Sequence, residues 1–328
     1  RARSEVGRIS MPAGPFRRRP RCLPPTIRMF VFFSYSPQIV LAILTPIGRV
    51  GSGVLVVTKQ TIGFIGLGDM GRPMAARLLG AGYPVLSYAH RRRQAIEALR
   101  RTGLEEVANA HAVGTRANII MTIVTDAAQT DTVLRGPDGA LAAMAPGGAV
   151  IVMSTLAPKY CQGLAEEAAN KNIAVLDCPV SGGTMGAEQG TLSLLTGGSA
   201  AAVAQCRQAL EAMGRIFHCG DIGMGQVAKL ANNSILFGCA GLLWEARKLA
   251  KAHGMAPEAL MEILRTSTGN TFMGENWEFF SDPGMWPHFI SMIAKDTALA
   301  ISAGDAAGTP MLMTRQTRSL DWQSTTSA

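Results

Sequence analysis

Lys229 and Asn233 lie four residues apart, and on a helix this spacing places both side chains on one face. Apolar residues around them predict a largely buried helix: Val227, Leu230, Ile235, Leu236, Leu242 and Leu243. Burial disfavours the charged form of a lysine and lowers its pKa towards neutrality, as a general acid/base requires. A lysine at the helix edge, with its ammonium in water, fits the same spacing equally well.

A second set of candidate ligand groups follows a predicted strand. Ser181, Gly182 and Gly183 offer a hydroxyl and glycine N–H groups, which together can bind a substrate carboxylate. A tight glycine loop without a ligand accounts for the same residues. Lys295 and Asp296 adjoin in a helical pattern, and such a pair alone is also typical of an exposed helix face.

Glycines in the pattern G-x-G-x-x-G stand between an apolar run at 61–65, suited to a buried parallel strand, and a helix that Pro73 can open. In this context the glycines permit a tight turn, the approach of a pyrophosphate and close packing of helix on strand. The N–H groups of the helix N-terminus then face the phosphates. The predicted dinucleotide-binding turn comprises Gly66, Leu67, Gly68, Asp69, Met70 and Gly71.

The end of the next predicted strand bears on the choice of cofactor. NAD-selective sites place Asp or Glu about 20 residues after the glycines, where it binds the ribose hydroxyls. Here that place holds Ala89, followed by His90, Arg91, Arg92 and Arg93. No carboxylate repels a 2′-phosphate, and an arginine can hold one, so the sequence favours NADP, with NAD as the alternative. A solvated helix start also accounts for some of the arginines.

Further apolar runs alternate with helical patterns and predict strands at 85–88, 118–124, 149–153 and 173–176. Alternating strands and helices imply a parallel, doubly wound α/β sheet whose ligand crevice lies at the carboxyl ends of the strands. Val124, Thr125 and Thr155 lie at such ends and are candidate cofactor contacts. Thr155 also fits the N-cap of a helix that starts near Pro158.

The positive charge of the chain is concentrated at its start. The whole sequence carries +8, but residues 1–60 hold nine Arg and one Lys against Glu5, a balance of +9, which leaves −1 for residues 61–328. We therefore expect no nucleic-acid partner, with nucleic-acid binding through the basic residues 1–60 as the alternative. The uncharged stretch 29–48 is long enough to cross a membrane, but Pro37 and polar residues interrupt it. We expect an extension outside the fold, with a membrane or export segment and an organellar presequence as alternatives.

The six cysteines contain no C-x-x-C pair, and their spacing suggests neither a disulfide framework nor a zinc site. Reduced thiols in a cytoplasmic protein are the simplest interpretation. We expect no metal ion.

Four motifs together resemble the β-hydroxyacid dehydrogenase family, whose members include 3-hydroxyisobutyrate dehydrogenase and tartronate semialdehyde reductase. The motifs are Gly-Phe-Ile-Gly-Leu-Gly-Asp-Met-Gly at 63–71, the segment from Asp177 to Leu192, the segment from Gly223 to Asn233 and the pair Lys295-Asp296. The resemblance implies a dinucleotide-binding Rossmann domain at 61–222, a long interdomain helix and an all-α C-terminal domain at 223–328 for substrate binding and oligomerisation. It also implies a homodimer or homotetramer.

By the same resemblance, Lys229 is the catalytic residue, Asn233 and the turn 181–183 hold the substrate, and Lys295 lies near both nicotinamide and substrate. Positions that match cofactor contacts are Val124, Thr125, Gln129 and Thr155. The resemblance implies an oxidoreductase that transfers a hydride between NAD(P) and a small 3-hydroxy acid or its semialdehyde, with Lys229 as general acid/base.

The C-terminal tail departs from the family pattern. Relatives continue after Pro310 through a further helix, whereas residues 314–328 contain only Leu320 and Trp322 as large apolar residues. We therefore expect the terminal helix to be missing, which would expose apolar surface. A non-catalytic or inactive, truncated dinucleotide-binding module of the same fold is the alternative function.

Overall fold

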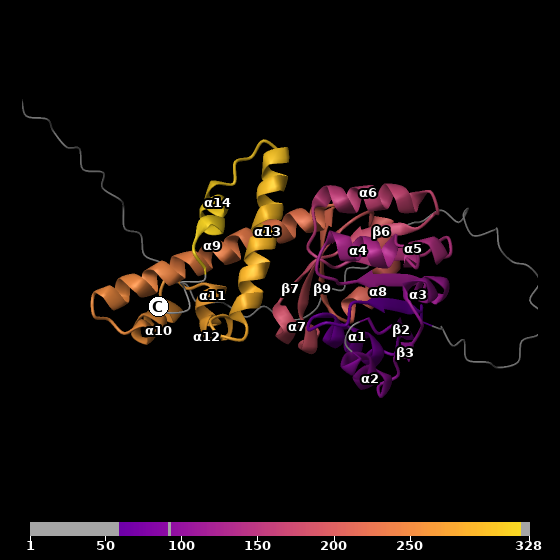
Figure 1. Cartoon of the computed structure of the whole chain (residues 1–328), viewed down its shortest axis with the longest axis horizontal. Helices are drawn as coiled ribbons and strands as arrows, with labels where there is room; N and C mark the ends of the chain where they lie inside the picture. Colours follow the sequence, from indigo (N-terminus) through magenta and orange to yellow (C-terminus); the bar gives the residue numbers. More distant parts are fainter. Residues whose placement is uncertain (1–58, 91–92, 323–328) are drawn as a thin grey trace, which may run out of the picture. The chain divides into compact units, whose positions relative to one another are not determined.

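The computed structural model describes residues 59–90 and 93–322 (Figure 1). In that part of the chain nine strands form one sheet: β1 (Ile62–Ile65), β2 (Val85–Ser87), β3 (Glu105–Glu106), β4 (Ile119–Thr122), β5 (Ala149–Val152), β6 (Ala174–Asp177), β7 (Val180–Ser181), β8 (Leu192–Gly197) and β9 (Gly214–Gly220). The helices between them are α1 (Gly71–Gly80), α2 (Gln94–Arg100), α3 (Ala110–Arg116), α4 (Ala127–Leu134), α5 (Ala140–Ala143), α6 (Pro158–Ala169), α7 (Gly183–Gln189) and α8 (Ala200–Glu211).

The strand order confirms the predicted doubly wound sheet. Strands β3, β2, β1, β4, β5 and β6 are neighbours in that order, and every pair among them is parallel. Beyond β6 the sheet changes direction, because β8 runs antiparallel to both β6 and β7, and β9 runs parallel to β8. The carboxyl ends of β1, β4 and β5 therefore lie at one edge, where a dinucleotide binds in such folds.

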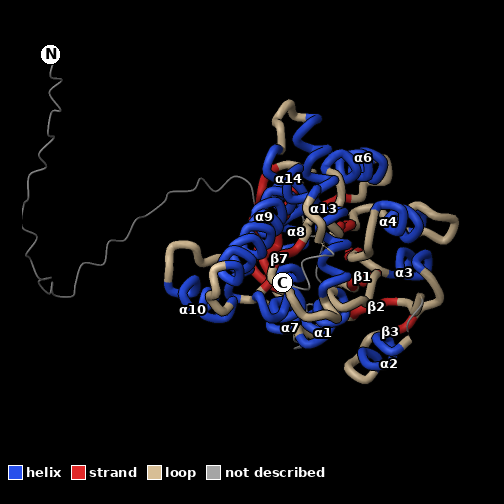
Figure 2. Tube along the Cα trace, turned by 60° about the vertical axis from the view of Figure 1, so that its left-hand side comes forward, coloured by secondary structure: helices blue, strands red, loops and turns tan. Residues whose placement is uncertain are grey.

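Helices cover both faces of the sheet (Figure 2). The side chains of the central strands alternate between these two faces, which explains the arrangement. Ile62 and Phe64 of β1 pack into a core shared with α1, α2 and α8, whereas Ile65 belongs to the core on the opposite face, shared with α3 and α6. Successive side chains of a strand point to opposite faces. Apolar residues at both kinds of position are thus buried on both faces, which is why these strands form continuous apolar runs.

Only helices follow the sheet within the described residues: α9 (Met224–Ala252), α10 (Pro257–Thr266), α11 (Phe272–Glu275), α12 (Trp277–Phe280), α13 (Trp286–Ala306) and α14 (Leu312–Ser319). The long helix α9 starts beside the sheet and packs against β8 and β9, and then against α13 and α14 (Figure 1). A separate core of aromatic and aliphatic side chains joins α9 to α13, including Phe237, Phe289 and Ile293.

Two expectations about this helical part are wrong. The terminal helix is not missing, because α14 forms and Trp322 after it is 5% exposed. Trp322 Nε1 donates to the Thr317 carbonyl oxygen, and the backbone carbonyl oxygen of Trp322 accepts from Trp286 Nε1, so this one residue anchors the tail. The helix α9 is not largely buried either, since Ile235 is 69% and Leu242 59% exposed.

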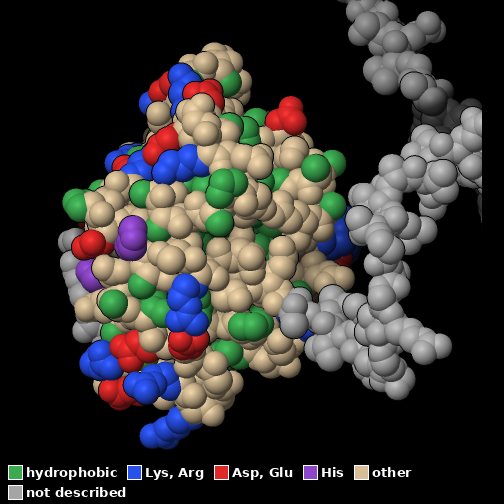
Figure 3. All heavy atoms as spheres, turned by 90° about the vertical axis from the view of Figure 1, so that its right-hand side faces the viewer, with side chains coloured by type: hydrophobic (Ala, Val, Ile, Leu, Met, Phe, Trp, Pro, Cys, Tyr) green, Lys and Arg blue, Asp and Glu red, His purple; other side chains and the backbone are tan. Residues whose placement is uncertain are grey.

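None of the helices in residues 59–90 and 93–322 combines the length and the apolar character that a membrane crossing requires. The stretch 29–48 lies outside the described residues, as do the other residues of the basic segment up to 58. On the face shown in Figure 3, basic and acidic side chains lie side by side and form no continuous basic patch. Across the same described ranges, no group of His, Cys, Asp and Glu side chains is arranged to hold a metal ion.

Candidate active site

The glycine turn between β1 and α1 has the shape that a pyrophosphate requires. Gly66 has φ +105°, and a Cβ there would lie 2.2 Å from the carbonyl oxygen of Ile123. A Cβ on Gly71 would lie 1.8 Å from the carbonyl oxygen of Gly66, so only glycine allows the helix to approach the strand this closely. Gly68, in contrast, borders open space. The turn therefore fits a dinucleotide, whose phosphates can reach the backbone at Gly68.

The start of α1 leaves backbone donors available to an anion. Met70 occupies the N-cap position, and its side chain provides no acceptor to the first turn. Unpaired N–H groups at a helix N-terminus attract phosphate. Leu67 and Met70 pack against the core of the sheet, whereas Asp69 is exposed.

The end of β2 leaves the choice between NAD and NADP open. His90 is exposed, and Arg91 and Arg92 lie outside the described residues. Arg93 pairs with Glu106 at 3.1 Å, and both line an open cleft of about 590 Å³. Glu106 already balances the charge of Arg93, so the predicted contact between an arginine and a 2′-phosphate rests on Arg91 and Arg92.

The loops after β4 and β5 are hydrogen-bonded to each other. Ser154 Oγ donates to the Val124 carbonyl oxygen at 2.7 Å and accepts from the Val124 N–H at 2.9 Å. Gln129 Oε1 accepts from the Thr125 N–H at 3.3 Å. The alternative role of Thr155 as an N-cap is wrong, because another residue holds that position in α6 and no side chain caps the helix. The candidate cofactor contacts thus surround the carboxyl ends of these two strands.

Ser181 ends β7, Gly182 is the N-cap residue of α7, and Gly183 is the first residue of that helix. The strand β7 pairs with β8, and α9 packs on β8, so the turn and the helix α9 adjoin the same strand. Within the described ranges, no hydrogen bond joins the turn to Lys229 or Asn233. The sequence predicts these groups in one site, and in the described residues the structure brings both next to β8.

A buried carboxylate holds the start of α9. Asp177, at the end of β6, is fully buried. Its Oδ1 accepts from the Gly223 N–H at 2.6 Å, and its Oδ2 accepts from the Gln226 N–H at 2.7 Å. Burial raises the pKa of Asp177, and the backbone donors offset part of that increase. Asp177 therefore satisfies donors that a helix N-terminus otherwise leaves unpaired.

Lys229 is half-buried one turn further along α9. Burial lowers the pKa of its ammonium to about 8, while the Asp296 carboxylate opposes this decrease and the Lys295 ammonium adds to it. In the part of the chain that the structure describes, Lys229 Nζ makes no hydrogen bond or ion pair. A group with this pKa can take up and release a proton near neutral pH.

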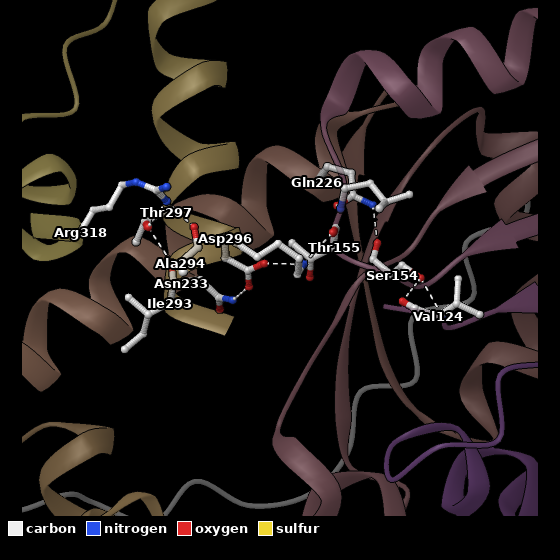
Figure 4. Close-up of polar contacts among 12 residues, drawn as sticks. Val124, Ser154, Thr155, Gln226, Asn233, Ile293, Ala294, Asp296, Thr297 and Arg318 are labelled. Carbon is white, nitrogen blue, oxygen red and sulfur yellow. Dashed lines mark hydrogen bonds and ion pairs between the residues drawn. The ribbon is translucent and has the colours of Figure 1, made fainter. Parts of the chain in front are cut away.

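Asp296, whose carboxylate favours the ammonium form of Lys229, connects α9 to α13 (Figure 4). The residue is 2% exposed, its Oδ2 accepts from Asn233 Nδ2 at 2.6 Å, and its Oδ1 lies 2.6 Å from Lys295 Nζ. Lys295 Nζ also donates to the carbonyl oxygen of Thr155 at 3.0 Å. Three predicted site residues, Asn233, Lys295 and Thr155, are thus brought together although they lie far apart in the sequence.

Asp296 and Gln226 are polar residues that sequence reasoning left without a role. Asp296 resembles one half of an exposed pair, but it falls four and three residues from Ala300 and Ile293, which are buried on α13. That helical spacing was the available signal for a buried carboxylate. Gln226 precedes Lys229 by three residues and is also fully buried, and its position four residues before the buried Leu230 offered the same signal.

A glycine turn of this kind at the carboxyl edge of a parallel sheet is typical of proteins that bind NAD(P) or a flavin dinucleotide. Comparison with known proteins places the chain more closely. The family model for the NAD binding domain of 6-phosphogluconate dehydrogenase matches residues 61–223. The model for the NAD-binding part of NADP-dependent 3-hydroxyisobutyrate dehydrogenase matches residues 223–327.

Individual relatives agree with these models. A 2-(hydroxymethyl)glutarate dehydrogenase from Eubacterium barkeri is 38% identical over 259 residues, which cover 77% of this chain and 85% of the relative. A 3-hydroxyisobutyrate dehydrogenase from Pseudomonas aeruginosa is 36% identical over 267 residues, covering 76% and 88%. The solved structure of a Mycobacterium tuberculosis 3-hydroxyisobutyrate dehydrogenase with L-serine matches with a TM-score of 0.69 and 28% identity, covering 82% of this chain and 98% of that one.

The chain belongs to the β-hydroxyacid dehydrogenase family, as the four sequence motifs predicted. It is an oxidoreductase that uses NAD(P).

Proposed function

We propose that the protein catalyses the reversible oxidation of a small 3-hydroxy acid to its semialdehyde, with Lys229 as general acid/base. The observation that carries this proposal is the half-buried side chain of Lys229. Burial lowers the pKa of its ammonium to about 8. An amine with that pKa is present in both protonation states at neutral pH, so it can serve either direction of the reaction.

In the oxidation, Lys229 Nζ as a neutral amine accepts the proton of the substrate hydroxyl while the C–H electron pair leaves the same carbon and a C=O bond forms. A bound nicotinamide supplies the acceptor for that hydride. In the reduction, the Lys229 ammonium donates the proton to the carbonyl oxygen. The substrate is held by Ser181, the N–H groups of Gly182 and Gly183, Asn233 and Lys295. These groups donate hydrogen bonds or carry a positive charge, and both suit a carboxylate.

The substrate class follows from what three relatives act on or bind. 3-Hydroxyisobutyrate, 2-(hydroxymethyl)glutarate and L-serine share one chemical core, a primary alcohol on the carbon next to a carbon that bears a carboxylate. The third substituent differs between them: a methyl, a propionate or an ammonium group. We infer that this chain accepts the shared core, and that the pocket around the third substituent selects among such acids.

For the cofactor, we propose NADP in preference to NAD. The support is the absence of a carboxylate at Ala89 and His90, where an NAD-selective site places one, and the presence of Arg91 and Arg92 directly after them. Val124, Thr125, Gln129, Thr155 and Lys295 complete the proposed cofactor site.

The experiment is a turnover assay of the full chain. The three acids above are oxidised with NADP and with NAD, and the variant Lys229→Ala is compared with Lys251→Ala, an exposed lysine near the end of α9. We expect turnover with at least one acid, and a kcat about 10²–10⁴-fold lower in Lys229→Ala, the range for loss of a general acid/base. Cofactor affinity and Lys251→Ala activity should stay unchanged. Near-normal turnover without Lys229, or none with any acid in the wild type, would refute the proposal.

We further propose a homodimer or homotetramer that works in the cytoplasm, divided into an extension at 1–60, the Rossmann domain at 61–222 and the helical domain at 223–328. Large apolar side chains exposed along one side of α9 support self-association: Val227, Ile235, Leu242 and Leu249. The five described cysteines are free thiols, which suits a reducing compartment.

A further inference from the structure

Gln226 lies in the first turn of α9, and its amide side chain is fully buried. A buried amide requires partners for both its oxygen and its nitrogen. The loop after β5 supplies them: Oε1 accepts from the Leu156 N–H at 2.9 Å, and Nε2 donates to the Ser154 carbonyl oxygen at 2.9 Å. The two bonds enclose Thr155, so one side chain of α9 fixes the peptide units on both sides of that residue.

The contact continues from the loop into the neighbouring strand (Figure 4). Ser154, whose carbonyl oxygen is bound by Gln226, uses its hydroxyl to bond both the N–H and the carbonyl oxygen of Val124. Val124 follows β4, and Ser154 follows β5. The ends of two adjacent parallel strands are therefore connected, through a single buried residue, to the helix that carries Lys229.

The enclosed residue Thr155 faces the opposite helix. Its carbonyl oxygen accepts from Lys295 Nζ, Lys295 is paired with Asp296, and Asp296 accepts from Asn233 on α9. The bonded path thus starts on α9 at Gln226, crosses the loop after β5 and α13, and returns to α9. A displacement of the loop after β5 would therefore act on α9 on both sides of Lys229, at Gln226 and at Asn233.

We propose that Gln226 is a positioning residue that couples the cofactor-binding ends of β4 and β5 to Lys229 and Asn233. The inference rests on the proposed function, because it takes Lys229 as the proton-transfer group and the strand ends as the cofactor side. Gln226 acts through the backbone of residues 154–156. Reactions of this kind depend on sub-ångström alignment, so a loop that shifts against α9 slows turnover even when both reactants bind.

Two substitutions separate this role from simple packing. Gln226→Met keeps the length of the side chain but removes both hydrogen bonds. Gln226→Glu keeps both when the carboxyl is protonated, since its hydroxyl then donates to Ser154, and loses the donor when it ionises. Gln162→Met is the matched control: Gln162 lies on α6, and its Nε2 donates to the Ile222 carbonyl oxygen at 3.4 Å, just before α9. In the described residues no hydrogen bond joins its side chain to residues 154–156.

The first readout is hydrogen exchange with and without saturating NADP or NAD, which does not depend on turnover. In the wild type, we expect cofactor to slow exchange in the glycine turn at 66–71 and also at the start of α9, residues 224–233. In Gln226→Met, the glycine turn should keep its protection and α9 should lose it. The inference would be overturned, and the proposed function left standing, if cofactor protected α9 equally in Gln226→Met and the wild type. The same holds if Gln162→Met lost the protection of α9 as fully as Gln226→Met. No protection of the glycine turn in the wild type would overturn the proposed function and this inference with it.

The second readout is kinetic. We expect Gln226→Met to lower kcat at least tenfold with less than a threefold change in either KM, and to increase the deuterium isotope effect on kcat because hydride transfer becomes slower than product release. In the reductive direction, Gln226→Glu should approach wild-type kcat at acidic pH and lose activity as its carboxyl ionises. A kcat within twofold of the wild type in folded Gln226→Met, or a Gln226→Glu profile parallel to the wild-type profile, would overturn the proposed role.

Discussion

The proton on Lys229 is controlled by the burial of its ammonium and by two charges on α13. Burial lowers the pKa to about 8, the Asp296 carboxylate favours the ammonium, and the Lys295 ammonium disfavours it. Asn233 donates a hydrogen bond to Oδ2 of Asp296, and Lys295 forms an ion pair with Oδ1. The pKa is therefore set by fixed groups, and its response to a mutation has a definite sign.

We predict opposite pH profiles for the two directions. Oxidation requires neutral Lys229, so kcat/KM should rise with pH and level off above about 8, whereas reduction requires the ammonium and should decline above that pH. Replacing Asp296 by Asn removes a charge that favours the ammonium, so both inflections should move to lower pH. Initial rates across pH, with the exposed Asp282→Asn as control, measure this. An inflection that stays in place or moves upward in Asp296→Asn would contradict the electrostatic account.

At the scale of elements, the sequence predicted best those strands that are buried on both faces of the sheet. Strands β1, β2, β4, β5 and β6 are continuous apolar runs because helices cover both faces of the sheet. The short strands β3 and β7 and the partly exposed β9 have no such run, so nothing in their sequence marked them. On α9, the exposed Ile235 and Leu242 have the helical spacing of a buried face, and spacing alone cannot say whether anything covers it.

For the C-terminal segment the sequence predicted too little structure, whereas for α9 it predicted too much burial. A segment with few apolar residues can still pack on the helical core when one of them is large and well placed. Polar residues dominate α14, but Thr314 and Thr317 are buried in it, and Trp322 packs beside Trp286 with ring centroids 6.1 Å apart. The hydroxyl of Thr317 bonds back to the Met313 carbonyl, so its burial leaves no unpaired donor.

We predict that Trp322→Ala lowers the free energy of unfolding by about 3–5 kcal/mol, the usual cost of truncating a buried tryptophan. The side chain is 5% exposed, and its loss also removes the donor to the Thr317 carbonyl. Leu312→Ala, on the same helix but 67% exposed, should change stability by less than about 0.5 kcal/mol. Denaturant titration measures both. Similar small changes for the two variants would mean that the tail contributes little to the helical core.

For the molecule as a whole, the net positive charge comes from one part of the chain, and the remaining residues are close to neutral. The balance of +9 falls in residues 1–60, whereas residues 61–328 carry −1. Ion pairs such as Arg116–Glu105 and Arg135–Glu167 intersperse the two signs on the α/β domain. A near-neutral, mixed surface neither attracts a polyanion nor prevents two copies from approaching. We therefore expect two copies to associate through apolar contact.

The exposed apolar side of α9 makes that contact testable. Val227, Ile235, Leu242 and Leu249 follow one another at intervals of eight and seven residues, so they form one stripe along the helix. We predict that the wild type is a dimer or tetramer by light scattering and that Ile235→Glu combined with Leu242→Glu dissociates it, because each carboxylate would have to be buried unpaired. Lys251→Glu, which changes charge on the opposite side of the same helix, should leave the oligomer intact. A wild type that is monomeric, or a double variant that stays associated, would show that this stripe does not form the interface.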